Sequence, residues 1–299
     1  MSTKPARTIA EQIAILKSRG MLFRDETKAV HYLKNISYYR LKGYWWDAQT
    51  DRVNHILIPD TYFEDIVDRY NFDRHFRIIL FDAIERIEIA LRTQMIYHVS
   101  LNHGPLWYQD ASLFSNPVYH ANNLSSLMRE FGYSQEIFIK DHRRRHPTSN
   151  PESWKILEIA SLGTLSKYYK LLKHNLPAKS AIANGMGLNL HTELSSWLES
   201  ITYVRNIVAH HSRLYERTMV KRPTLNITNP QLDWLNNSVS EEQQKKVFLI
   251  VSCMLYICNK VTPGHSIKQK IKELIQENHP FPIHKFGFSD DWELQNLWK

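Results

Sequence analysis

Residues 72–92 read FDRHFRIILFDAIERIEIALR, and this stretch is the strongest structural signal in the chain. Its apolar side chains recur every three or four residues, at Phe72, Phe76, Ile79, Leu80, Ala83, Ile84, Ile87 and Leu91. That spacing is typical of one face of an α-helix, and the stripe is wide enough for a helix at the centre of a domain. We predict a helix over about 62–100, opened by a capping box of Thr61 and Glu64.

Helical patterns continue on both sides of this stretch. Thr8 and Glu11 have capping-box form at the start of an amphipathic helix that Gly20 is placed to end. Further helices are expected at about 26–34, 122–140, 154–174, 178–185 and 192–216, and from the Ser240-x-x-Gln243 cap to about Lys260. The predicted fold is therefore an all-α helical bundle, with at most a short β element near residues 47–60. We predict one helical domain over 1–230 and a helical extension over 231–299 packed on it.

Composition narrows the class of protein. Glycine supplies only 9 of 299 residues, roughly 3% against the usual ~7%, which disfavours glycine-rich phosphate loops. Cys253 and Cys258 form no CxxC pair, and the longest apolar run, Val247–Cys258, is too short to span a bilayer. We expect a cytoplasmic protein without membrane contact. The net charge of +8 permits a polyanionic partner such as RNA.

The sharpest local pattern is residues 199–213, ESITYVRNIVAHHSR. On a helix, five of its polar residues fall within an arc of about 80°: Glu199, Thr202, Asn206, His210 and Arg213. Arg205 lies on the flank of this stripe, and its side chain is long enough to reach His210. Apolar residues occupy the other side and would face the core. A continuous polar stripe on a packed helix is costly unless its groups are used or well paired.

Arg205, Asn206 and His210 together suit phosphodiester chemistry. Imidazole exchanges protons near neutral pH, and guanidinium offers a forked donor that matches phosphate oxygens. The alternative is a structural polar ladder, in which Arg205 pairs with a carboxylate and His210 bonds a neighbouring carbonyl. The spacing alone leaves both readings open. We expect no metal site and no cofactor, because no HExxH motif or carboxylate cluster accompanies His210.

Residues 205–215, RNIVAHHSRLY, resemble the signature of the Abi-like (AbiD/AbiF) abortive-infection proteins of the HEPN superfamily, whose ribonuclease motif is R-x(4–6)-H. The resemblance covers about residues 8–217. Its other landmarks are KSRGMLF at 17–23, NISYYRLKGY at 35–44, Phe72-Asp73 with Arg77, IERIEIALR at 84–92, SLGTLS at 161–166 and Leu194-x-x-Trp197-Leu198. The sequence departs from it at Leu214-Tyr-Glu-Arg217, where the family is expected to prefer Leu-Trp-Asn-Arg.

This resemblance implies an all-helical homodimer in which two R-x4-H helices face each other across a composite cleft. It implies metal-independent RNA cleavage that leaves a 2′,3′-cyclic phosphate and a 5′-hydroxyl, in phage defence or toxin–antitoxin control. His210 would be the general acid/base, Arg205 would stabilise the transition state and Asn206 would orient them. Arg213 would engage a neighbouring phosphate. A restraining partner, either RNA or an antitoxin protein, is expected.

Several residues are candidates for supporting roles. Glu88 is expected to hold Arg205, unless Glu88 belongs to an internal ion-pair ladder with Glu85 and Arg92. Thr202 could orient RNA or bond the backbone of its own helix. His211 is expected to be a core or interface histidine rather than a catalyst.

The densest basic cluster is Lys140, Arg143, Arg144 and Arg145, which either attracts RNA phosphates or forms a solvated loop. Two other functions fit the same sequence. The chain could be a catalytically silent RNA-binding module that uses this basic surface. It could also be a helical protein-interaction factor in which the polar stripe is a dimer seam.

Overall fold

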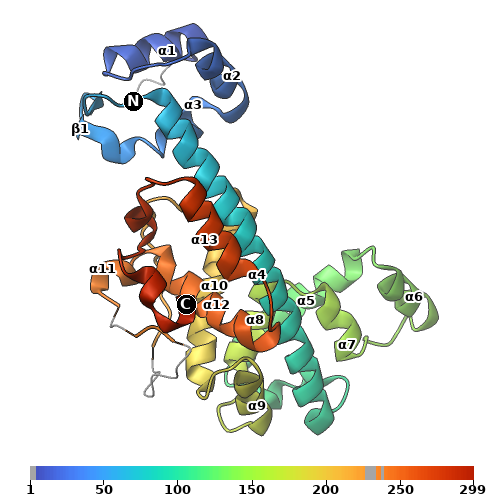
Figure 1. Ribbon diagram of the computed structural model, residues 1–299. Helices are drawn as coiled ribbons and strands as arrows, with labels where there is room; N and C mark the ends of the chain where they lie inside the picture. The colour runs from blue at the N-terminus through green and yellow to red at the C-terminus, as the bar shows by residue number, and fades with distance from the viewer. Residues whose placement is uncertain (1–4, 226–233, 237–238) are drawn as a thin grey trace. The chain divides into compact units, whose positions relative to one another are not determined.

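The computed structural model describes residues 5–225, 234–236 and 239–299, and it confirms the all-α class. These residues form thirteen α-helices and one two-stranded sheet. By packing, the chain divides into two compact units. The first holds Met1–Arg77 with Arg213–Tyr215, and the second holds Ile78–Ser212 with Glu216–Lys299. Figure 1 labels the α-helices of both. The predicted domain boundary at residue 230 lies outside the described residues.

The first unit is built from short helices. They are α1 (Ile9–Ser18), α2 (Glu26–Ile36), α3 (Tyr38–Lys42), the 3-10 turn η1 (Trp46–Ala48) and the first part of α4 (Phe63–His103). The capping box at the start of α1 is confirmed: Glu11 N–H donates to the Thr8 hydroxyl at 3.2 Å, and Thr8 N–H donates to the Glu11 carboxylate at 2.7 Å. Gly20, with φ at 93°, follows α1 as predicted.

The long helix predicted over 62–100 is confirmed as α4, but its predicted capping box is wrong. The Glu64 carboxylate accepts the backbone N–H groups of Arg24 at 3.1 Å and Asp25 at 2.9 Å. Thr61 donates its hydroxyl to the carbonyl of Ile58. Glu64 thus satisfies N–H groups at the entrance to α2, a contact between residues about forty positions apart that a four-residue pattern cannot reveal.

The short β element expected near 47–60 is also confirmed. Strands β1 (Gln49–Asp51) and β2 (Ile56–Leu57) pair antiparallel, with Gln49 opposite Leu57 and Asp51 opposite Ile56. An irregularity in register separates those two pairs. The Asp51 carboxylate accepts the N–H groups of Val53 and Asn54, so it fixes the turn between the strands.

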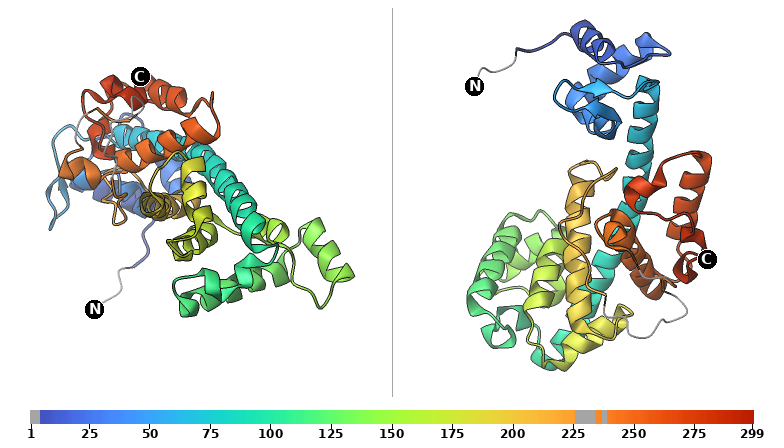
Figure 2. Two further views of the ribbon diagram at one scale, coloured as in Figure 1. Left: turned by 90° about the horizontal axis from the view of Figure 1, so that it is seen from below. Right: turned by 90° about the vertical axis from the view of Figure 1, so that its left-hand side faces the viewer.

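The second unit begins with the remainder of α4. Its further α-helices are α5 (Pro117–Tyr133), α6 (Ile137–Arg145), α7 (Ser153–Ile156), α8 (Leu162–Leu171), α9 (Pro177–Gly185), α10 (His191–Ala209), α11 (Glu241–Gln244), α12 (Val247–Val261) and α13 (Ile267–Glu277). The 3-10 turns of this unit are η2 (Trp107–Gln109), η3 (Ala111–Leu113), η4 (Leu157–Ile159), η5 (Ile283–Phe286), η6 (Trp292–Leu294) and η7 (Asn296–Trp298). Helices α8, α10 and α12 lie side by side, as Figure 2 shows.

Three predicted helices are divided in the structure. The helix expected at 154–174 is α7, η4 and α8. The helix expected at 122–140 is α5 and α6, and α5 starts earlier because Pro117 stands in its first turn and the Asn116 side chain caps it. The capping box of Ser240 and Gln243 is confirmed, but it opens the four-residue α11, and the long α12 starts only after Lys246.

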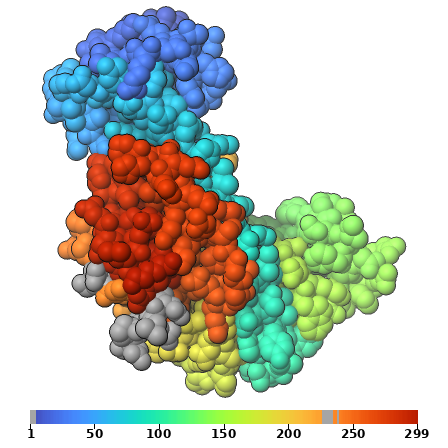
Figure 3. Space-filling view, viewed as in Figure 1, coloured from blue at the N-terminus to red at the C-terminus, as the bar shows by residue number. Residues whose placement is uncertain are grey.

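The C-terminal segments pack within the second unit. The Cys258 thiol on α12 contacts the carbonyl of Ala83 on α4, and Lys270 on α13 pairs with Asp82 at 3.2 Å. In Figure 3 the described residues after 239 form one surface, coloured orange to red, beside α4. Across the described ranges, no helix combines the length and the apolarity that a membrane span requires.

Candidate active site

Helix α10 presents the motif residues to solvent because its other face is held in the core. Ile201, Val204, Ile207 and Val208 are all buried. On the remaining surface Arg205 is half-buried, and Asn206 and His210 are exposed. The core of the second unit therefore fixes the backbone of the motif while leaving its polar side chains accessible.

The end of α10 differs from the prediction of a helix to residue 216. The last helical residue is Ala209, His210 is the C-cap and His211 takes a left-handed conformation with φ at 54°. Two backbone bonds close the helix: His211 N–H to Val208 at 3.0 Å and Ser212 N–H to Ile207 at 2.8 Å. This is a Schellman ending, in which glycine usually occupies the left-handed position. A residue with a side chain in this left-handed conformation costs about 1–2 kcal/mol. Because histidine stands where glycine is usual, the sequence does not indicate that the helix ends here.

Long-range contacts replace that missing signal. The next residues, Arg213–Tyr215, belong to the first unit, where Asp73 accepts the N–H groups of Leu214 at 3.1 Å and Tyr215 at 3.0 Å. Asp73 also accepts the Tyr44 hydroxyl at 2.6 Å and forms an ion pair with Arg77. We call Asp73, Tyr44, Arg77 and Arg213–Tyr215 the Asp73 clamp. Burial raises the pKa of Asp73, while Arg77 and its hydrogen-bond donors favour the carboxylate.

The predicted contact of Arg213 with a phosphate is not supported, because the structure uses this side chain elsewhere. The Arg213 guanidinium donates to the carbonyl of Gly43. A Cβ on Gly43 would lie 3.2 Å from Arg213 Nε, so the glycine permits this close approach. The angular position assigned to Arg213 on a continuous helix does not apply beyond Ala209.

The departure from the family pattern at 215–216 has local consequences. Tyr215 is buried, and its hydroxyl bonds Asp47 at 2.9 Å, a contact that the expected tryptophan could not make in the same way. Glu216 has φ at 54° and pairs with Lys285 at 3.2 Å. Asparagine tolerates this left-handed region better than glutamate, so the family's expected residue would suit that backbone.

Among the described side-chain contacts of the three motif residues, only Arg205 and Asn206 meet. Arg205 Nη1 lies 3.4 Å from Asn206 Oδ1, so these two side chains are brought together. Arg205 and His210 are five residues apart, which places them about 140° apart around a helix and about 7.5 Å apart along it.

The prediction that Glu88 holds Arg205 is wrong, and the alternative of an internal ion pair is correct for Glu88. Glu88 Oε1 lies 3.0 Å from Arg92 Nη2. Arg92 also donates to the carbonyls of Leu157 at 2.8 Å and Ala160 at 3.0 Å. Its role is to join α4 to the segment that leads into α8.

The two other residues of the predicted polar stripe, Glu199 and Thr202, differ in how their polar atoms are satisfied. Glu199 pairs with Lys170 at 2.7 Å and Lys221 at 2.5 Å, and these hydrogen bonds lower the pKa of Glu199. The Thr202 hydroxyl oxygen is buried and has no hydrogen-bond partner among the described residues. A Cβ on Gly163 would lie 3.6 Å from the Thr202 methyl group, so α8 and α10 meet closely there.

The basic cluster lies on α6 rather than in a loop. Arg143 donates to the carbonyls of Phe131, Gly132 and Ser134, so it caps the end of α5. Arg144 and Arg145 share Asp141 at 2.7 and 3.0 Å but remain largely exposed, and Lys140 is exposed as well. Three of the four predicted RNA contacts thus stay accessible, and Arg143 serves the fold.

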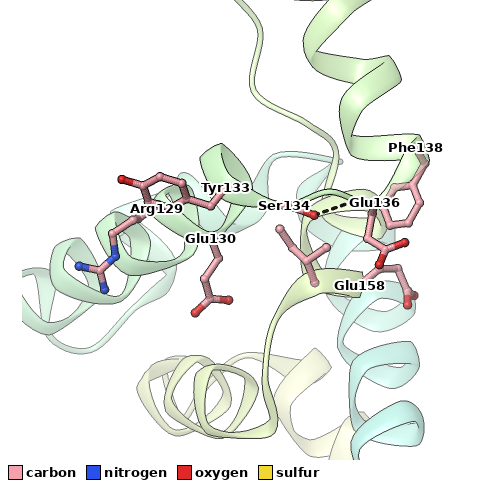
Figure 4. A pocket seen from close by; sticks show the side chains of 8 residues that line it. Arg129, Glu130, Tyr133, Ser134, Glu136, Phe138 and Glu158 are labelled. Carbon is pink, nitrogen blue, oxygen red and sulfur yellow. Dashed lines mark hydrogen bonds between the residues drawn. The ribbon is translucent and has the colours of Figure 1, made fainter.

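A cavity of about 640 Å³ lies beside α5, α6 and η4, and its lining is acidic. Figure 4 shows Glu136 and Glu158 on one side and Arg129 and Glu130 on the other. Burial raises the pKa of Glu130. Three carboxylates against one guanidinium make this cavity a poor receptor for a phosphate backbone. Among the described residues, no group of three or more His, Cys, Asp and Glu side chains is arranged to hold a metal ion.

Sequence reasoning placed Asp73 and Arg77 among the family landmarks but gave them no role. The signal available was their spacing, since residues four apart on a helix can pair. It could not show that residues 214 and 215 bind the same carboxylate.

The comparison with protein families gives one result, and it covers the motif. The family described as Abi-like protein matches residues 31–216. The matched segment includes Asp73, α10 and Arg213–Tyr215. Neither the curated proteins nor the solved structures gave a match.

Proposed function

The chain belongs to the Abi-like protein family, and we propose that it is a metal-independent endoribonuclease of the HEPN type that acts in bacterial phage defence. The observation that carries this proposal is that the polar side chains of Arg205, Asn206 and His210 stay accessible. The fold buries the apolar face of α10 and uses Glu199 and Arg213 in structural contacts, yet it leaves these three polar groups accessible at the end of the helix. No structural bond with another element is described for them.

The chemistry needs no redox partner. The His210 imidazole accepts the proton of a ribose 2′-hydroxyl, whose oxygen attacks the adjacent phosphorus. The bond from phosphorus to the 5′-oxygen breaks, and that oxygen takes a proton, so the products are a 2′,3′-cyclic phosphate and a 5′-hydroxyl. Arg205 stabilises the additional negative charge on the phosphoryl oxygens in the transition state, and Asn206 orients Arg205.

A two-chain site fits the geometry of the motif. Because Arg205 and His210 diverge around α10, two copies of the helix end facing one phosphodiester would supply one histidine as base and the other as acid. The accessible Lys140, Arg144 and Arg145 are proposed to attract RNA from a distance. Control by an inhibitory RNA or an antitoxin protein is part of the proposal, since separating the two motifs would silence the site.

The test is cleavage of end-labelled RNA in EDTA by the full chain and by His210→Ala and Arg205→Ala. Each substitution is expected to lower the cleavage rate by about 10²- to 10⁴-fold, with circular dichroism unchanged because both residues are accessible. His191→Ala, on the first turn of the same helix, is the matched control and should cleave normally. His211→Ala decides which of the adjacent histidines acts, and we expect it to retain cleavage.

The outcomes separate the three functions. Cyclic-phosphate ends that disappear with His210→Ala support the nuclease. RNA binding that weakens with salt, without cleavage and without sensitivity to His210→Ala, would replace it with a silent RNA-binding module. Loss of folding or association in the Arg205 and His210 variants, before any change in RNA handling, would identify a structural seam.

A further inference from the structure

The aromatic residues in and just after α3 divide between the core and the surface of the first unit. Leu41, Tyr44 and Trp45 are buried and hold this segment in place. Tyr39 and Trp46, by contrast, are 78% and 40% exposed. Helix α3 is labelled in Figure 1. The fold thus anchors the segment through one set of side chains and leaves two aromatic rings accessible.

Positively charged side chains flank the two accessible rings. On a helix, Lys42 lies about 60° from Tyr39 on one side, and Arg40 lies about 100° from it on the other. The Lys42 ammonium stands over the Trp46 ring, 5.5 Å from its centroid. Arg40 is exposed and Lys42 is half-buried. We call Tyr39, Arg40, Lys42 and Trp46 the Tyr39 surface.

The sequence around this surface carries only one sign of charge. No Asp or Glu occurs in residues 27–46, whereas four positively charged residues do: Lys28, Lys34, Arg40 and Lys42. The next residue is acidic, but the Asp47 carboxylate accepts the Tyr215 hydroxyl at 2.9 Å and pairs with Arg69 at 3.4 Å. A cluster of this sign attracts a polyanion such as a phosphate backbone.

The exposed ring of Tyr39 is supported by its neighbour in the chain. Tyr38 packs edge-on against Tyr39, with ring centroids 5.7 Å apart, and edge-on against the buried Trp45. The Arg19 guanidinium donates to the Tyr38 hydroxyl at 2.7 Å, so Tyr38 is itself held. A ring that is already positioned loses less conformational freedom on binding, which favours contact with a ligand.

We propose that the Tyr39 surface binds single-stranded RNA, with unpaired bases stacked on Tyr39 and Trp46 and the flanking phosphates on Arg40 and Lys42. Every base has a flat π face, so this contact requires no particular sequence. Bases within a duplex are already stacked on one another, so the surface selects unpaired strands. The inference rests on the proposed function for the identity of the polyanion, RNA, and adds the form in which it is bound.

The exposed side chains favour a nucleic acid over an anionic membrane. A membrane-binding surface inserts aliphatic and aromatic side chains together. In residues 27–46, all of which the structure describes, Tyr39 and Trp46 are the large apolar residues that are exposed, and neither is aliphatic. An acidic peptide would use the positive charges but not the flat rings. Stacked bases with phosphates between them use both.

The experiment measures binding by the full chain without relying on cleavage. The first ligand is a fluorescein-labelled 2′-O-methyl oligouridylate of about 12 nucleotides, long enough to fill one site. Its blocked 2′-oxygen cannot attack phosphorus, so it stays intact. The second ligand is an abasic oligomer of the same length, which carries the same phosphates and no bases. Fluorescence anisotropy gives the Kd of each.

Tyr39→Ala and Trp46→Ala should each raise the Kd for the oligouridylate by about 5- to 150-fold, which is the loss of one stacked base. Neither should change the Kd for the abasic oligomer. Tyr39→Phe keeps the ring and should bind as the wild type does. Arg40→Ala removes a charge and should weaken both ligands alike. Circular dichroism is expected to be unchanged in Tyr39→Ala, because the ring is exposed.

Tyr133→Ala is the matched control. Tyr133 is exactly as exposed as Tyr39, at 78%, but it lies beside the carboxylates of Glu130 and Glu136 in the acidic cavity. An exposed ring in surroundings of the opposite charge should not bind RNA, so this variant should leave both Kd values unchanged.

Several results overturn the proposal. They are a wild type that binds neither ligand, unchanged oligouridylate affinity in both ring variants, equal losses for the two ligands, and an equal loss in Tyr133→Ala. Binding to vesicles of phosphatidylcholine and phosphatidylserine that Tyr39→Ala abolishes, with oligouridylate binding intact, would assign the surface to a membrane instead.

The nuclease and the Tyr39 surface fail separately. His210→Ala should bind the oligouridylate as the wild type does, because it changes the motif alone. Ring-dependent binding by a wild type that cleaves no RNA would refute the nuclease and retain this surface. Cleavage that depends on His210, without ring-dependent binding, would do the reverse.

Discussion

Residues 205–215 pass through two contrasting environments. In the second unit, Arg205, Asn206 and His210 lie on the accessible side of α10, and the one bond described between their side chains is 3.4 Å long. In the first unit, Arg213–Tyr215 are held by the Asp73 clamp, where the carboxylate is fully buried and bonds two backbone N–H groups, a tyrosine and an arginine. Only two residues of sequence separate these environments.

The contrast separates groups that stabilise the fold from groups available for chemistry. A buried charge is tolerated only when its partners satisfy it, and removing one partner leaves the other charge unpaired in the interior. An accessible polar group contributes little to stability and can exchange its water for a ligand. The predictions below test whether the two parts of this segment divide in that way.

The largest effect is expected for Asp73→Ala. This substitution removes the buried carboxylate that pairs with Arg77 and the acceptor for Leu214 and Tyr215, so it should lower the free energy of unfolding by about 3–5 kcal/mol. Urea denaturation followed by circular dichroism provides the measurement. Asp65→Ala is the matched control, because Asp65 also pairs with an arginine, Arg24, but at the surface.

The control should lose less than about 1 kcal/mol. Equal losses in Asp73→Ala and Asp65→Ala would show that the clamp is not a stabilising element. The contrast between the two environments would also fail if Arg205→Ala or His210→Ala lowered the free energy of unfolding as much as Asp73→Ala does. Substitutions at accessible positions are expected to change it by no more than about 0.5 kcal/mol.

A smaller effect is expected for Tyr44→Phe, which removes one hydroxyl from the clamp and keeps its ring. Burial and the neighbouring Asp73 carboxylate raise the pKa of Tyr44, so its hydroxyl stays protonated and donates to Asp73 at 2.6 Å. Loss of this charged hydrogen bond should cost about 1.5–3 kcal/mol. Tyr39→Phe, at an exposed tyrosine of the same unit, is the control. If the two substitutions have the same effect on the denaturation midpoint, the hydroxyl has no stabilising role.

The sequence predicted what depends on local periodicity. The apolar spacing in 72–92 is a property of a single helix, so α4 was predicted nearly to its ends, and the caps at Thr8 and Ser240 followed from patterns of four residues. The motif residues were also predicted to lie on one helix, and they do, apart from His210 at its C-cap.

Features set by distant residues were not predicted. The end of α10 has no glycine or proline at its left-handed position, because Asp73, more than 130 residues earlier, anchors the chain that follows. Glu64 was assigned to its own helix and binds the entrance of α2 instead. Glu88 was assigned to Arg205, although the i, i+4 spacing to Arg92 was visible in the sequence. Glu64 had a plausible local partner and makes a distant contact instead, whereas Glu88 keeps its local partner Arg92 and makes no described contact with Arg205.

The smallest effect is expected for Glu199. Its carboxylate forms ion pairs, as Asp73 does, but it is partly exposed to solvent, as the motif residues are. Lys170 and Lys221 lower the pKa of Glu199 below its ordinary value of 4.5. A lowered pKa in the folded state means that the carboxylate stabilises the protein above the unfolded-state pKa, and that this contribution disappears as the pH falls through the folded-state pKa. Glu199→Gln should therefore cost less than about 1 kcal/mol at pH 7, after allowance for solvent screening, and nothing once the pH is low enough to protonate Glu199 in the wild type. Urea denaturation of both proteins across pH 3–7 provides the measurement, and an unchanging difference over that range would show that the loss comes from packing rather than from charge.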